Sequence, residues 1–224
     1  LCTVVAERGR RRRWVPSTWC GEVSAAIITD WGETVRALLS VWDKVGVVEF
    51  AQGLHDLGWD LVSTGQTHAV IAAAGIPVRQ VADVTGSPEI LGGRVKSLHP
   101  AIHGGILARR DHPGDVADLA THDIAAIDLV ACNLYPFVAT ISADQLPPPP
   151  LGDAMRADVA SATDHIDIGG PAMVRAAAKN FADVIVVTDP EDYLVVLEAL
   201  RAGGVALPMR ARFAQAAFAH VSQY

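Results

Sequence analysis

From residue 36 onward, short apolar runs alternate with amphipathic stretches. Five runs have the length and composition of buried strands: 37–41, 59–63, 77–81, 127–131 and 184–188. Apolar residues at helical spacing predict helices between and after these runs, over 47–57, 67–74, 114–122, 190–202 and 208–221. Strands that alternate with helices through short connections favour an α/β fold of Rossmann type. We expect a mainly parallel sheet that helices cover on both faces.

Two stretches break the alternation. Residues 1–34 contain a basic run, Arg10 to Arg13, without helical or strand period. We expect a poorly ordered extension there, rather than a signal peptide or a nucleic-acid-binding tail, and a single domain over residues 35–224. The second stretch holds four prolines at 147–150. An exposed loop is the expected structure, with a partner-docking peptide as the alternative.

Composition narrows the class of protein. The chain has 224 residues, of which 50% are hydrophobic and 19% charged, which is typical of a soluble α/β enzyme. Its net charge of -7 disfavours a general nucleic-acid-binding protein. The three cysteines are widely spaced and odd in number, so we expect a reducing cytoplasm and no disulfide framework. No apolar run approaches the roughly 18 residues of a membrane span.

Polar motifs follow three of the predicted strands: residues 40–44, 63–67 and 132–136. The carboxyl ends of parallel strands meet at one edge of a sheet, where ligands bind in α/β proteins. Residues 63–67 also open a helix, whose first N–H groups favour an anion. Ordinary helix capping is the alternative for that motif taken alone. Together the three motifs predict a ligand site at this edge.

Two further stretches carry candidate chemistry. The loop 92–100 opens with two glycines and contains Arg94 and Lys96, which suit a small anion unless they are merely solvated. In residues 166–180, Asp167 precedes a predicted helix and is a candidate carboxylate base. Lys179 lies 12 positions later. A straight helix would separate the two backbones by roughly 18 Å, so Lys179 either reaches back or only interacts with the helix dipole.

The sequence gives little support for a metal centre or for a hydrolase with a nucleophilic triad. His99 and His103 are four residues apart, but Pro100 between them makes a continuous helical face improbable. No nucleophile elbow is present either. The sequence therefore predicts neither a metal centre nor a nucleophilic triad.

Five motifs occur together in one order: residues 40–44, 63–65, 93–100, 133–137 and 167–180. Through them the chain from about residue 36 resembles the inosine monophosphate (IMP) cyclohydrolase domain of the bifunctional purine biosynthesis family. The resemblance implies a methylglyoxal-synthase-like (MGS-like) fold. It also implies dehydrative closure of 5-formamidoimidazole-4-carboxamide ribotide to IMP without cofactor or metal. Expected partners are a second copy in a homodimer and, in the absence of a fused formyltransferase domain, a separate formyltransferase.

The same resemblance implies roles for individual residues. Asp167 would be the base, Lys96 and Lys179 would stabilise the oxyanion or protonate the departing water, and Tyr135 would donate a hydrogen bond. Asn133 and Arg94 would orient the base and the carboxamide. The remaining substrate-binding residues, most of them for the ribose phosphate, would be Ser40, Lys44, Ser63, Thr64, Gly65, Thr67, Ser97, Cys132, Gly169 and Gly170.

Three alternatives stay open at this point. The family usually has Tyr, Gly and Thr at the positions of Trp42, Gln66 and Ser97, so a cyclohydrolase for a related ribotide in specialised nucleoside metabolism is one. A methylglyoxal-synthase-like lyase would need catalytic aspartates after the early strands, and no convincing pair is present. A nucleotide-sensing module would keep the phosphate loops but has no need of Asp167 and Lys179.

Overall fold

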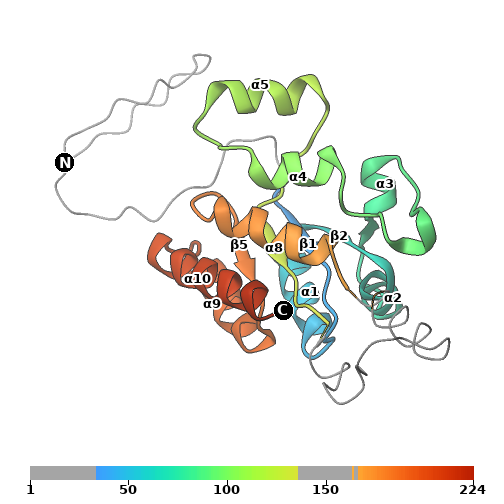
Figure 1. Cartoon of the computed structure of the whole chain (residues 1–224). Helices are drawn as coiled ribbons and strands as arrows, with labels where there is room; N and C mark the ends of the chain where they lie inside the picture. The colour runs from blue at the N-terminus through green and yellow to red at the C-terminus, as the bar shows by residue number, and fades with distance from the viewer. Residues whose placement is uncertain (1–33, 136–162, 164–165) are drawn as a thin grey trace, which may run out of the picture.

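A parallel sheet forms the centre of the molecule (Figure 1). The computed structural model describes residues 34–135, 163 and 166–224. In this part of the chain, five strands pair in the order β3-β2-β1-β4-β5, and every pairing is parallel. The strands are β1 Arg36–Leu39, β2 Asp60–Ser63, β3 Arg79–Gln80, β4 Leu129–Ala131 and β5 Ile185–Val187. The predicted parallel α/β fold is confirmed.

Helices cover both faces of this sheet. Their bounds are α1 Val47–Asp56, α2 Gly65–Ala73, α3 Val81–Thr85, α4 Pro100–Leu107, α5 Pro113–Thr121, α8 Gly169–Lys179, α9 Tyr193–Arg201 and α10 Leu207–Gln223, with 3-10 turns at Leu91–Gly93 and Pro190–Asp192. Helix α1 packs against α2 and α9, whereas α8 packs against α4 and α10. Right-handed crossovers place these two groups on opposite faces.

The strands are short, and all except the exposed edge strand β3 are largely buried, as expected for a sheet covered on both sides. Buried apolar side chains from Ala37 to Ala217 form one cluster. Phe50 of α1 stacks on Tyr193 of α9, with ring centroids 4.3 Å apart and the planes only 8° from parallel. This stack joins an early and a late helix on one face of the sheet.

Charged groups hold the amino ends of the strands. The Arg36 side chain donates to Asp60 over 2.7 Å, and the Arg36 backbone N–H donates to Asp128 over 2.9 Å. Burial alone would raise the pKa of the Asp60 carboxyl, but hydrogen bonds from Arg79 and Arg36 lower it below its ordinary value. These pairs tie β1 to the strand on either side. The opposite, carboxyl edge is left to the polar motifs.

Two local predictions were wrong. Pro100 was expected to interrupt a helix between His99 and His103, but it occupies the first turn of α4, where its missing N–H costs nothing. The ring Nδ1 of His99 accepts from the backbone N–H of Ala101 and caps that helix. The third strand is also shorter than predicted, because Val81 already begins α3.

Some expectations fall outside the described part of the chain. Residues 1–33 and the proline run 147–150 are among the residues that the structure does not describe, so the predicted extension, loop and domain boundary stay predictions. In the described ranges, no helix is both long and apolar enough to cross a membrane.

Candidate active site

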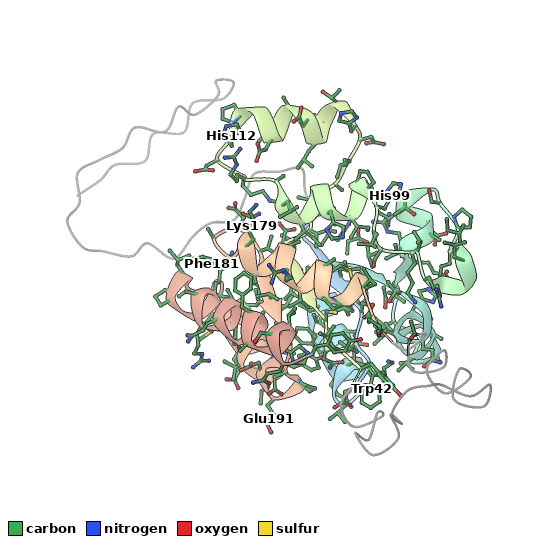
Figure 2. All side chains as sticks on the ribbon, viewed as in Figure 1. Trp42, His99, His112, Lys179, Phe181 and Glu191 are labelled. Atoms are coloured by element: carbon green, nitrogen blue, oxygen red, sulfur yellow. The ribbon has the colours of Figure 1, made fainter. Side chains whose placement is uncertain are left out.

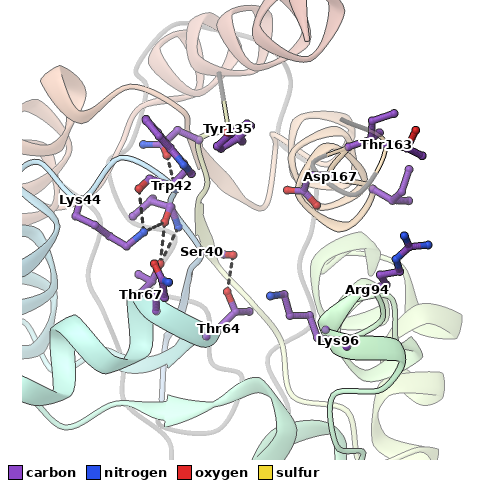
Figure 3. Close-up of a pocket in the computed structure, with 18 residues that line it drawn as sticks. Ser40, Trp42, Lys44, Thr64, Thr67, Arg94, Lys96, Tyr135, Thr163 and Asp167 are labelled. Atoms are coloured by element: carbon purple, nitrogen blue, oxygen red, sulfur yellow. Dashed lines mark hydrogen bonds between the residues drawn. The ribbon is translucent and has the colours of Figure 1, made fainter. Parts of the chain in front are cut away.

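A cavity of about 720 Å³ opens beyond the carboxyl ends of β1, β2 and β4 (Figure 3). Its lining comes from segments far apart in the sequence: 40–44, 64–67, 92–96, 133–135, Thr163 and 166–168. The crossovers from β1 and β4 pass over opposite faces of the sheet, so the cavity lies at the switch point where α/β folds bind ligands. The predicted gathering of the polar motifs at one edge is therefore observed.

One wall is the first turn of α2. Gly65, Gln66 and Thr67 line the cavity there, and their N–H groups have no acceptor within the helix. The Lys96 ammonium approaches from the facing segment and lies 3.7 Å from where a Cβ on Gly65 would stand. A helix N-terminus and a lysine therefore converge on one volume, which favours an anionic group such as a phosphate.

Hydroxyl groups join this wall to the loop after β1. The Thr67 Oγ1 accepts from the Val41 N–H over 3.2 Å and donates to the Val41 carbonyl over 2.9 Å. Ser40 and Thr64 share a hydrogen bond of 2.6 Å between their hydroxyls. The Ser63 side chain, in contrast, is fully buried and donates to the Leu39 carbonyl. Ser63 was expected to contact the ligand, but it supports the strand and does not line the cavity.

The loop after β1 is held mainly by polar side chains that bind backbone groups. The Asn133 Oδ1 accepts from the N–H groups of Trp42 and Asp43 over 2.6 and 2.8 Å. The Lys44 ammonium donates to the carbonyls of Val41 and Trp42. Burial lowers the pKa of Lys44, and the nearby Asp43 opposes this effect. Asn133 and Lys44 both line the cavity, but many of their hydrogen bonds hold the backbone of this loop.

Aromatic side chains form the neighbouring part of the lining. The rings of Trp42 and Tyr135 meet edge to face, with centroids 5.5 Å apart. Trp42 is 51% exposed, so one side of the indole remains available to a flat ligand. Sequence reasoning did not choose Trp42 as a site residue, although it lies inside the motif 40–44.

Asp167 lies at the start of α8 and is held at two points. Its Oδ1 accepts from the Gly170 N–H over 3.1 Å, and its own N–H donates to the Tyr224 hydroxyl over 2.6 Å. Gly170 is required here, because a Cβ would stand 2.3 Å from the Asp167 Oδ2. Likewise, a Cβ on Gly169 would stand 2.7 Å from the Ser97 Oγ. Gly169, Gly170 and Ser97 were expected to bind substrate, but none of them lines the cavity. The two glycines instead leave space for the side chains of Ser97 and Asp167.

Two more expected site residues lie outside the lining. Lys179 ends α8 with an exposed side chain, and Figure 2 shows it well apart from Trp42. Because α8 continues unbroken from Gly169, Lys179 cannot fold back to Asp167, and the predicted convergence of the two is wrong within one chain. The Cys132 thiol is buried with its Sγ 3.9 Å from the Gly170 carbonyl, and burial raises its pKa.

Sequence reasoning also missed several lining residues. Gln66 lies inside a recognised motif, whereas Thr163, Ile166 and Ile168 lie before α8. Ile166 and Ile168 are 45% and 59% exposed, unusually open for isoleucine, and they flank Asp167. The sequence signal that could have identified these two isoleucines is that they flank a lone carboxylate, Asp167. Over the described residues, no group of three His, Cys, Asp or Glu side chains could hold a metal ion.

Comparisons with known proteins agree with this geometry. Residues 46–172 match the MGS-like domain family, and residues 177–224 match the family described as AICARFT/IMPCHase bienzyme. The bifunctional purine biosynthesis protein PurH of Chloroflexus aurantiacus is 57% identical over 192 residues, which are 85% of this chain and 35% of PurH. The chain thus spans about a third of the length of that relative. The crystal structure of ForH is similar with a TM-score of 0.71 and 38% identity, covering 85% of this chain and 95% of ForH.

Proposed function

This chain belongs to the MGS-like domain family, and we propose that it is an IMP cyclohydrolase of purine biosynthesis. The reaction closes 5-formamidoimidazole-4-carboxamide ribotide to IMP with loss of water. The observation that carries the proposal is that Asp167, Lys96 and Tyr135 line a single cavity whose wall is the first turn of α2. The similarity to PurH and to the AICARFT/IMPCHase bienzyme family supports the same reaction.

The cavity suggests how the ribotide is oriented. The phosphate binds at the α2 N-terminus beside Thr64 and Gly65. The imidazole ring then extends toward Tyr135 and Asp167, with the Trp42 indole and the two isoleucines as apolar surfaces. Arg94 lies on the loop that carries Lys96 and is placed to bind the carboxamide oxygen.

The chemistry needs a base and a donor on opposite sides of one forming bond. The carboxamide nitrogen attacks the formyl carbon and transfers a proton to Asp167, which acts as general base. Lys96 and Tyr135 stabilise the negative charge that develops on the former formyl oxygen. Loss of that oxygen as water, with a second proton from the formamido nitrogen, gives the aromatic pyrimidinone ring. Because both reacting groups belong to one molecule, positioning supplies much of the acceleration. Lys179 has no part in this scheme.

Turnover of the formamido ribotide, followed by ultraviolet absorbance, tests the proposal. Asp167→Asn should lower kcat by about 10²- to 10⁴-fold, the usual contribution of a general base, while IMP binding stays within a few-fold. Asp118→Asn is the matched control, because Asp118 is exposed on α5 and outside the cavity. An Asp167→Asn enzyme that remains active would show that another group is the base.

The same assay separates the alternatives. Purified wild-type chain that binds IMP tightly but gives no turnover would be a nucleotide-sensing module. A turnover that is poor with this ribotide but efficient with a related one would indicate specialised nucleoside metabolism.

The proposed assembly and location rest on the family resemblance and on the cysteine pattern. We infer a homodimer from the family resemblance, and light scattering of the purified chain tests it. The widely spaced, odd-numbered cysteines favour the reducing cytoplasm. A formyl-transferring enzyme must supply the substrate, and co-purification of such an activity with this chain would support a separate formyltransferase.

A further inference from the structure

The last turn of α10 contacts two segments that form the cavity. The ring Nε2 of His220 accepts from the backbone N–H of Leu134 over 3.2 Å. The hydroxyl of Tyr224 accepts from the backbone N–H of Asp167 over 2.6 Å. Neither His220 nor Tyr224 lines the cavity. His220 lies in the last turn of α10, and Tyr224 directly follows the last helical residue, Gln223, as the C-cap.

The two bonded N–H groups lie next to the groups that do the proposed chemistry. Leu134 directly precedes Tyr135 and follows Asn133, and Asp167 is the proposed base. We propose that His220 and Tyr224 are positioning residues through which α10 fixes the separation between the Tyr135 phenol and the Asp167 carboxylate. This inference rests on the proposed function for its catalytic part, whereas the two hydrogen bonds can be tested without substrate.

Packing makes α10 a suitable frame for this purpose. It lies against α8, which begins two residues after Asp167, and against β5, which pairs with β4. Figure 1 shows α10 running alongside α8 with its C-terminal end beneath it. The C-terminal end of one helix thus holds the segments around Leu134 and Asp167, which lie 86 and 57 residues away in the sequence.

Each hydrogen bond restrains a backbone group beside the cavity. Leu134 is buried, so its N–H would lose its partner without gaining water if His220 were absent. Asp167 is already held through Oδ1 by the Gly170 N–H, and the Tyr224 bond fixes the backbone as well. With backbone and side chain both held, the orientation of the carboxylate is set before substrate arrives, which is how catalytic groups gain rate.

His220 can accept at Nε2 only as a neutral ring with its proton on Nδ1, a tautomer inferred from the donor it faces. Glutamine can offer a carbonyl oxygen in a similar place, whereas leucine cannot. Phenylalanine at position 224 removes only the hydroxyl. Position 220 thus offers a conservative and a disruptive variant, and position 224 offers a variant that lacks only the hydroxyl.

The kinetic test compares Tyr224→Phe and His220→Leu with wild type and with Gln223→Ala, an exposed neighbour on the same turn. Since a displacement near 1 Å can cost about 100-fold, we expect each of the first two to lower kcat by about 10-fold. KM should stay within about twofold, because the phosphate wall on α2 is untouched. His220→Gln should recover most of the lost kcat. Unchanged kcat in both variants, or a rise in KM alone, would overturn the proposal.

Amide hydrogen exchange of the substrate-free protein, resolved by NMR, provides the second readout. The Leu134 amide should exchange at least about 10-fold faster in His220→Leu, and the Asp167 amide in Tyr224→Phe, without general loss of protection in the sheet. Unchanged exchange at both amides would refute the restraint by these two hydrogen bonds, even if the wild-type protein proved inactive. Wild type that binds IMP without turnover would instead refute the proposed function, and the exchange data would still decide the positioning.

Discussion

Gly170→Ala tests whether the position of the Asp167 carboxylate matters for turnover. The added methyl group would stand 2.3 Å from the Asp167 Oδ2 and 2.8 Å from a methyl of Leu134. Restoring an ordinary contact of at least 3.4 Å moves the carboxylate by about 1 Å. The Gly170 N–H remains in alanine, so the variant changes space and leaves the hydrogen-bonding groups in place.

The expected effect on rate is large and the effect on stability is small. A displacement of about 1 Å at a catalytic group lowers kcat by about 100-fold, or about 2.7 kcal/mol of barrier. Overpacking costs about 1–3 kcal/mol, and replacing a helical glycine by alanine returns up to about 1 kcal/mol. We therefore expect a net loss of about 1 kcal/mol in the free energy of unfolding.

Ultraviolet turnover assays and urea unfolding measure the two quantities. The matched control is Gly104→Ala in α4, a helical glycine whose Cβ would approach Ile124 no closer than 3.3 Å. That variant should keep wild-type kcat. A Gly170→Ala enzyme with kcat within threefold of wild type would refute the view that the carboxylate must stay where the structure places it.

Three further predictions concern stability. Thr67→Val leaves the buried N–H and carbonyl of Val41 without their partner and should cost about 1–3 kcal/mol in urea unfolding, with Thr67→Ser recovering most of it. Asn180→Ala removes two buried donations to backbone carbonyls and should cost about 2–3 kcal/mol in the same assay, whereas removal of an exposed amide, as in Gln215→Ala, should cost little. Burial lowers the pKa of His103 and of His220 in the folded state, so the unfolded chain binds more protons below about pH 6.5. Stability should thus rise with pH from about 5 to 7, and His103→Gln should flatten that rise; an unchanged slope would contradict the assignment.

The fold was predictable because burial dominates its strands. The interior of a strand covered on both faces is apolar, and a short apolar run such as 129–131 favours a buried strand at that length. The boundaries were harder, since they depend on caps that sequence shows only weakly. Helix α4 was missed because Pro100 was interpreted as a break between His99 and His103, whereas it is the first residue of a helix capped by His99.

The site was predictable where its residues follow strands. The motif 40–44 had to lie at the carboxyl edge once β1 was placed, and Lys96 joined it through its own loop. Residues placed by helix geometry were harder to assign. Lys179 shares a motif with Asp167, but the unbroken α8 separates them. The role of Gly170 also needed coordinates, because sequence shows a glycine but not the carboxylate that fills its space.

If the chain catalyses the proposed ring closure, the hydrogen bonds of the site explain why so many polar residues serve so simple a reaction. Thr67, Asn133 and Lys44 all use side-chain groups to bind backbone atoms of the loop after β1. An intramolecular ring closure needs few groups for proton transfer, but it needs the reacting ends of the ribotide to be held together. A cavity that assigns several of its polar side chains to fixing its own backbone is suited to that demand. The same argument places the specificity of the site in its shape, because the phosphate wall is built from backbone and hydroxyl groups that any ribotide of this size can use.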